Sequence, residues 1–109
     1  MTAPSRREKI ETMLADDPTD QFLRFSLAME LEKEDRHDES LARHDELTRD
    51  ETPYVASYFM SAQQLARLGR TGDARSVLRT GIDEARRQKN MHAAGEMSEF
   101  LASLGSAGE

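Results

Sequence analysis

The hydrophobic positions of this chain recur every three or four residues, in segments separated by short polar turns. The segment over residues 21–34 has apolar residues on two faces of a helix, namely Phe22, Phe25, Leu27, Ala28 and Leu31. A helix of this kind packs on both sides. Similar spacing predicts helices over about residues 5–16, 38–49, 53–68, 72–88 and 90–104. The chain is therefore predicted to be all-α, with about six helices.

Short signals in the turns predict where these helices begin and end. Asp17 can cap free backbone N–H groups and Pro18 suits a first helical turn, so this pair predicts a helix start. Thr52 and Pro53 repeat the signal. In the stretch "LARLGRTGDAR", Gly69 is predicted to end one helix and Thr71 to cap the next. A phosphate-binding loop is not expected here, because such a loop follows a strand and carries Gly-Lys-Ser/Thr.

The apolar pattern repeats along the chain. A shift of 34 residues superposes Phe25 on Phe59, Ala28 on Ala62, Leu31 on Leu65 and Ser40 on Ala74. A further shift of 36 residues places Leu68-Gly69 on Leu104-Gly105. Such a period predicts a stack of supersecondary units that share one core.

The unit from Tyr58 resembles the tetratricopeptide repeat family, whose units are 34-residue helix-turn-helix pairs. It matches that family at its large aromatic, its small residues, its bulky position and its turn glycine, which are Tyr58, Ala62, Ala74, Leu65 and Gly69. The unit from Gln21 departs from the family pattern at four places, with Arg24 for the aromatic, Asp35 for the glycine, Ser40 for the alanine and His44 for a core apolar residue. Asp35 remains compatible, because Asp tolerates a left-handed turn better than most residues.

The resemblance implies one domain over residues 1–109, a short right-handed superhelical stack of helix-turn-helix repeats. Its parts would be a first helix over residues 5–16, repeat units over about 18–51 and 53–88, and a closing helix over about 90–104. In that family the first helix of each unit lines a concave inner face. The face would bind a peptide or helical segment through Phe22, Phe25, Met29, Lys33, Phe59, Gln63 and Arg67.

Four alternatives for this inner face stay open. The N-terminal helix, the C-terminal tail or bending of the stack could cover its rings, or a second copy of the chain could bury them in a homodimer. The carboxylate clamp of heat-shock cochaperones is not expected, because the matching positions are Phe25, Met29, Met60, His92 and Glu96. An apolar or amphipathic protein segment is therefore the expected partner.

Charge narrows the classes of partner. The net charge is -6, which argues against binding to nucleic acid or to an anionic membrane. Residues 1–52 carry 8 basic and 15 acidic residues (net -7), whereas residues 53–109 carry 7 and 6 (net +1). This asymmetry suggests that the acidic stretch Glu32–Glu39 faces a basic row formed by Arg67, Arg70 and Arg75. The chain has no cysteine and no apolar run of membrane-spanning length, so a cytoplasmic location is expected.

The sequence offers no catalytic constellation. Its histidines, His37, His44 and His92, lack the spacing that presents two metal ligands on one helix face. His44 is expected to half-fill an apolar position, with a weak surface metal site between His37 and His44 as the lesser alternative. Acidic residues cluster in polar turns without shielding, and no serine lies in a nucleophile elbow. The chain is thus predicted to be a non-catalytic interaction module without cofactor or metal. The alternatives are a self-associating structural protein and a ligand- or metal-binding accessory domain.

Overall fold

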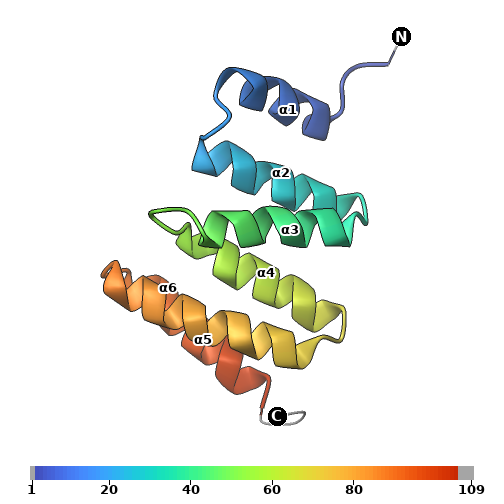
Figure 1. Cartoon of the computed structure of the whole chain (residues 1–109). Coiled ribbons are helices and arrows are strands. Elements are labelled where there is room, and N and C mark those ends of the chain that lie inside the picture. The colour runs from blue at the N-terminus through green and yellow to red at the C-terminus, as the bar shows by residue number, and fades with distance from the viewer. Residues whose placement is uncertain (1, 106–109) are drawn as a thin grey trace. The chain divides into compact units, whose positions relative to one another are not determined.

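A computed structural model of the chain describes residues 2–105, and regular structure in that range consists of six α-helices and no strand (Figure 1). The helices are α1 (Arg6–Asp16), α2 (Gln21–Lys33), α3 (His37–Thr48), α4 (Val55–Arg67), α5 (Thr71–Arg87) and α6 (Met91–Ser103). The predicted fold class, all-α with about six helices, is confirmed.

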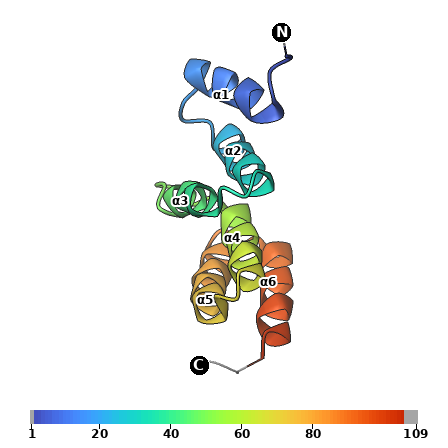
Figure 2. The ribbon, with the colours of Figure 1, turned by 90° about the vertical axis from the view of Figure 1, so that its right-hand side faces the viewer.

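The described chain divides into two compact units between Thr52 and Pro53. In the N-terminal unit, α2 packs against α1 on one side and α3 on the other. In the C-terminal unit, α5 packs against α4 and α6, and α4 also contacts α6 (Figure 2). Each unit is thus built around one helix that packs on two sides.

The helix starts differ from the sequence prediction in three places, one of which is α4, where the N-cap residue is Tyr54 and not Thr52. Asp17 ends α1, because its N–H donates to the carbonyl of Met13 at 3.1 Å, and the side chain of Asp20 caps α2 by accepting from the N–H of Leu23 at 2.8 Å. The prediction that Asp17 caps this helix was therefore wrong. Thr71 is the first residue of α5, and the residue before it, Arg70, makes no side-chain cap hydrogen bond.

The turns between paired helices share one backbone geometry. Asp35 and Gly69 both have positive φ, 60° and 81°. In each turn the next residue, Arg36 or Arg70, donates its N–H to a carbonyl five residues back, at 2.9 Å. A left-handed residue closes a helix in this way, and Asp accepts the conformation better than most non-glycine residues. The prediction for Asp35 is confirmed.

The two cores use different side chains. Ile10, Leu27 and Leu31 form a buried cluster between α1 and α2. In the C-terminal unit Tyr58 lies over Gly81, where an added Cβ would come within 2.5 Å of the Tyr58 Cβ. Glycine is therefore required at position 81 for close approach. No helix in the described range is long and apolar enough to cross a membrane.

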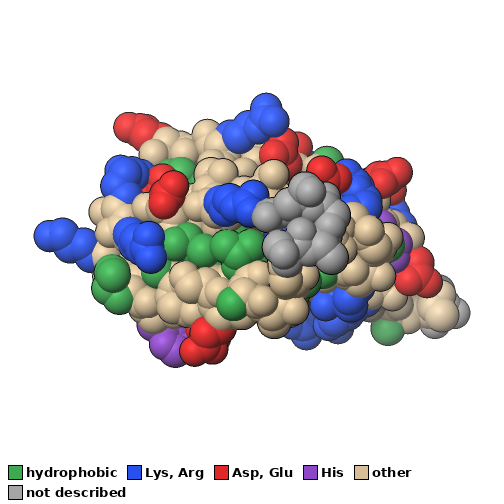
Figure 3. Space-filling view, turned by 90° about the horizontal axis from the view of Figure 1, so that it is seen from below, with side chains coloured by type: hydrophobic (Ala, Val, Ile, Leu, Met, Phe, Trp, Pro, Cys, Tyr) green, Lys and Arg blue, Asp and Glu red, His purple; other side chains and the backbone are tan. Residues whose placement is uncertain are grey.

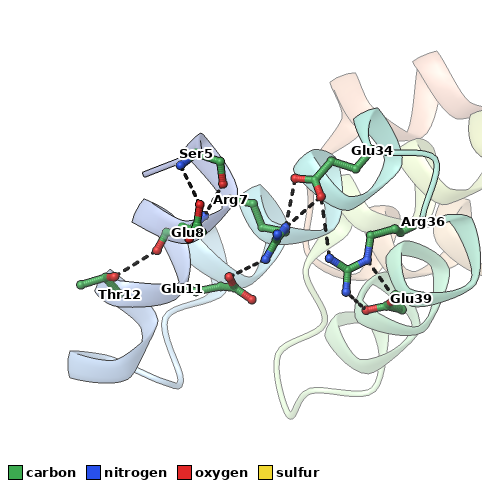
Figure 4. Close-up of polar contacts among 8 residues, drawn as sticks. All are labelled: Ser5, Arg7, Glu8, Glu11, Thr12, Glu34, Arg36 and Glu39. Atoms are coloured by element: carbon green, nitrogen blue, oxygen red, sulfur yellow. Dashed lines mark hydrogen bonds and ion pairs between the residues drawn. The ribbon is translucent and has the colours of Figure 1, made fainter. Parts of the chain in front are cut away.

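Ion pairs tie α1 to the end of α2 (Figure 4). The Nε atom of Arg7 donates to both carboxylate oxygens of Glu34, at 2.9 and 3.0 Å, and its Nη1 atom donates to Glu11 at 2.7 Å. Arg36 binds Glu39 at 2.7 Å and lies 3.7 Å from Glu34. Part of the acidic stretch is thus neutralised within its own unit.

Arg75 does not belong to an exposed basic row. Its side chain is buried, and its guanidinium donates to the backbone carbonyls of Leu104 and Gly105 just after α6. These carbonyls lack helical partners at the end of a helix, so a cation is well placed there. The expectation that Arg75 faces the acidic stretch was wrong, because Arg75 closes α6 instead.

Candidate functional site

The α2 half of the predicted inner face carries an exposed aromatic ring. Phe22, Phe25, Met29 and Lys33 follow one another at intervals of three and four residues, which places them on one side of α2. Phe22 is 65% exposed, whereas Phe25 and Met29 are half-buried. Lys33 is exposed and its Nζ lies 3.0 Å from Glu30. This side of α2 therefore offers one open ring beside two partly accessible apolar side chains.

Phe25 rests on a buried histidine. The ring centroids of Phe25 and His44 are 5.6 Å apart, with an interplanar angle of 63°, an edge-to-face contact. Burial lowers the pKa of His44 to about 4, against a smaller opposing effect of Glu32. The imidazole is thus neutral near pH 7 and serves as part of the apolar support. The expectation that His44 occupies an apolar position is confirmed, although it is fully rather than half-buried.

The α4 half of the predicted face consists of Phe59, Gln63 and Arg67, spaced four residues apart. Phe59 is half-buried, and its ring lies 5.9 Å from that of Phe100 in α6, at an interplanar angle of 59°. Gln63 is half-buried and Arg67 is exposed. The aromatic residue of this half therefore has an intramolecular ring partner, as Phe25 has in the other half.

The seven predicted residues belong to two units. Four lie on α2 in the N-terminal unit and three lie on α4 in the C-terminal unit. Within α2 the structure places the predicted residues on one side. The three phenylalanines differ in exposure. Phe22 is the most exposed ring, whereas Phe25 and Phe59 are half-buried and contact a ring of their own unit. The corresponding residues on α6, His92, Gly95, Glu99 and Ala102, are all exposed.

A hollow of about 310 Å³ lies in the N-terminal unit and was not predicted from the sequence. It has Leu14, Pro18 and Leu27 as its apolar lining, and charged side chains of all three helices complete it. One of its lining residues, Arg24, occupies the position of the aromatic Tyr58 one repeat later, and no pattern in the sequence marks the hollow itself.

The histidines do not form a metal site. His44 is buried, and His37 lies 3.7 Å from Asp35 at the other end of the turn. Among the residues that the structure describes, no group of three His, Cys, Asp or Glu side chains could hold a metal ion.

Comparison with known proteins supports the repeat architecture. No protein-family model and no curated protein matches the sequence. The solution structure of a tetratricopeptide repeat domain protein from Salinibacter ruber matches with a TM-score of 0.76 and 30% sequence identity, covering 83% of this chain and 91% of that one. A protein from Bordetella parapertussis has the same fold, with a TM-score of 0.77, 24% identity, and coverage of 94% and 89%.

Proposed function

Because this chain belongs to the tetratricopeptide repeat family, whose folds are generally non-catalytic protein-interaction scaffolds, we propose that it binds a peptide or helical segment of another protein through the side of α2, in the N-terminal unit, that carries Phe22, Phe25 and Met29. Phe22 carries the proposal. A phenylalanine that is 65% exposed, beside half-buried Phe25 and Met29, gives this face an exposed apolar surface.

The chemistry of this face favours an apolar or amphipathic partner. Phe22 can insert between apolar side chains of a partner. Aromatic residues in such positions often contribute much of a binding free energy. Lys33 is exposed at the far end of α2 and suits a partner with acidic residues at its edge. An amphipathic helix presents both features in one segment.

A displayed library of amphipathic peptides selected on the chain, followed by calorimetry on the selected peptides, tests the proposal. Phe22→Ser should weaken binding about tenfold or more, since truncating an aromatic anchor typically costs about 2 kcal/mol. Met13→Ser is the matched control, because Met13 is 52% exposed on α1 and lies outside the proposed face. Equal affinities for the Phe22→Ser chain and the unsubstituted chain would refute binding at this face.

A homodimer is the second candidate. Seen from below, the molecule shows a row of hydrophobic side chains bordered by Lys and Arg side chains (Figure 3). In the C-terminal unit α6 packs on α4 and α5, and it keeps Leu101 and Leu104 only half-buried. Sedimentation equilibrium over a concentration series distinguishes the two candidates. A dimer that Leu101→Ser weakens and Phe22→Ser leaves intact would place self-association at α6.

A further inference from the structure

The last described helix, α6, has an apolar side that no other helix of the described chain covers. Met91 is 61% exposed, and Gly95 and Ala102 are exposed as well. Ser98 and Leu101, on the same side at intervals of three and four residues, are half-buried. A helix that closes a stack of repeats is expected to have a polar outer side. The apolar side of α6 therefore indicates a surface against which a further helix packs.

The N-terminal unit shows what covers the corresponding side of α2. Shifts of 34 and then 36 residues superpose Ala28 on Ser98 and Leu31 on Leu101. Ala28 and Leu31 are 0% and 3% exposed, so they are more deeply buried than their counterparts on α6. Helix α3 packs against α2, and the hydroxyl of Ser40 in α3 donates to the carbonyl of Ala28 at 2.6 Å. In α2 this side is thus covered by the second helix of the pair.

The helices that precede α2 and α6 also correspond. Ile10 of α1 and Leu27 of α2 belong to one buried cluster. Two shifts of 34 residues superpose Ile10 on Leu78 of α5, and Leu27 has Met97 as its counterpart in α6. Leu78 and Met97 are both 0% exposed. The α5–α6 pair therefore resembles the α1–α2 pair, but the described chain has no counterpart of α3 beside α6.

The charges beside this uncovered side differ from those in the N-terminal unit. There, Glu11 of α1 and Arg43 of α3 line the same hollow, so an acidic and a basic residue border it from two helices. Two shifts of 34 residues superpose Glu11 on Arg79 of α5, and Arg86 follows two turns later. Both arginines are exposed. A helix that covers α6 therefore requires an acidic residue where α3 has Arg43.

The crossing of the two helices requires a small residue on each of them. In the α4–α5 pair Ala62 and Ala74 are both 0% exposed, as Ser40 is in α3. Helix α6 supplies Ser98, so the covering helix must supply the other small residue. A second copy of this chain has no such helix to offer, because Ser40 and Ala74 are buried in their own pairs and α1 has Arg6 at that place.

We propose that the side of α6 with Ser98 and Leu101, together with the adjoining side of α5, binds one amphipathic helix of a partner protein. This helix covers α6 as α3 covers α2. It has a small residue over Ser98, an apolar residue one turn later, and a carboxylate beside Arg79 and Arg86. The site belongs to the C-terminal unit, so it does not depend on binding at the Phe22 side of α2.

Titration of the ¹⁵N-labelled full chain with a synthetic peptide tests the site. The peptide copies residues 70–87 with Val77→Glu, because α5 has the small and apolar residues required, Ala74 and Leu78, and position 77 corresponds to Arg43. We expect saturable amide shifts around Ser98 in α6 and in the adjoining part of α5. The dissociation constant should be on the order of 1 mM, since a short peptide must also become ordered as a helix.

Two control peptides leave the chain itself unchanged. A peptide with Ala74→Leu in addition to Val77→Glu should bind about tenfold more weakly, because the larger residue keeps the helices apart at the crossing. A peptide with Val77→Lys in place of Val77→Glu should bind about fivefold more weakly at low salt, and added salt should reduce that difference. Equal affinities of all three peptides would overturn the proposal.

Variants of the chain locate the peptide. Ser98→Leu should weaken binding about tenfold, whereas Ser103→Leu, an exposed position on a different side of α6, should leave it unchanged. Arg79→Glu should reverse the preference, so that the Val77→Lys peptide binds more tightly than the Val77→Glu peptide. A purely structural role of Arg79 would weaken both peptides alike, and that result would overturn the charge assignment.

The pattern of amide shifts distinguishes the other possible outcomes. Shifts at Phe22 and Met29 without shifts in α6 would overturn this proposal and support binding at the side of α2. Shifts of the α6 amides when the chain is concentrated without peptide would show that a second copy covers α6, which also overturns it. Shifts in α6 that saturate with peptide, while α2 is unaffected, support the site even if the side of α2 binds nothing.

Discussion

The helix pairs α2–α3 and α4–α5 have the same turn geometry but differ in the chemistry of their interiors. Where α4–α5 has Tyr58, Ala74 and Leu78, the α2–α3 pair has polar residues in their places, Arg24, Ser40 and His44. Ser40 donates to the carbonyl of Ala28 at 2.6 Å, and Arg24 binds Asp50. Buried polar groups are tolerated when partners within the same unit satisfy them. The same helix-turn-helix backbone can therefore be stabilised by apolar side chains in one pair and by hydrogen-bonded polar side chains in the other.

The largest expected effect comes from adding a side chain at position 81 of α5, where the corresponding position of α3, Leu47, has one. Gly81→Ala should lower the free energy of unfolding by about 3 kcal/mol, because its Cβ would lie 2.5 Å from the Tyr58 Cβ and 2.8 Å from the Met97 sulfur. Thermal and urea unfolding measure the change. Gly95→Ala is the control, since nothing lies within 4 Å of its added Cβ. That variant should be about 0.5–1 kcal/mol more stable. A Gly81→Ala variant as stable as Gly95→Ala would show that Tyr58 moves aside without cost.

The second expected effect concerns the helix crossing that both pairs share. Ala62 is fully buried at the position of Ala28, so Ala62→Leu should overpack the crossing and cost about 2 kcal/mol. Ala42→Leu should change stability little, because Ala42 is exposed on α3. Melting curves of the two variants provide the measurement, and coincident curves would mean that the crossing can relax around a larger side chain.

The third expected effect is a dependence of stability on pH, which His44 causes and which Leu78, at the same position one repeat later, cannot cause. Burial lowers the pKa of His44 from 6.5 to about 4, so the folded state favours the neutral ring. The resulting stability is present above pH 6.5 and is lost as the pH falls toward 4. Between pH 7 and about pH 5.5 the unsubstituted chain should lose about 1 kcal/mol more than His44→Leu, which copies Leu78. Parallel pH profiles of the two proteins in urea unfolding would contradict the lowered pKa.

Much of this fold could be predicted from the sequence, because helix spacing and the 34-residue period are local and repeated signals. Helix starts were less certain, since Asp17 and Asp20 are both suitable caps and tertiary packing decides between them. The burial of Arg75 depends on the backbone carbonyls after α6, about one helix pair away in sequence. The contact of Arg24 with Asp50 likewise joins residues 26 positions apart. A periodic pattern of apolar residues does not indicate which polar side chains, so far apart in sequence, will form hydrogen bonds.

The smallest expected effect tests the ion pair that replaces an aromatic contact in α2–α3. The Arg24 guanidinium lowers the pKa of Asp50, with a further hydrogen bond from Gln21, so the folded state prefers the carboxylate. Asp50→Asn removes the charge but keeps one oxygen that can accept from Arg24. Because the pair is partly buried, the free energy of unfolding at pH 7 should fall by about 1 kcal/mol.

The matched control for this pair is Asp45→Asn, which removes an exposed carboxylate 3.0 Å from Arg49. Exposed pairs contribute little because water screens them, so this variant should unfold at nearly the same urea concentration as the unsubstituted chain. Protection of the α2 amides from hydrogen exchange gives a second readout. It should decrease in Asp50→Asn, since Gln21 and Arg24 hold the start of α2 to this carboxylate. If the two variants were equally stable and equally protected, the Arg24 contact would not replace the structural contribution that Tyr58 makes in the other pair.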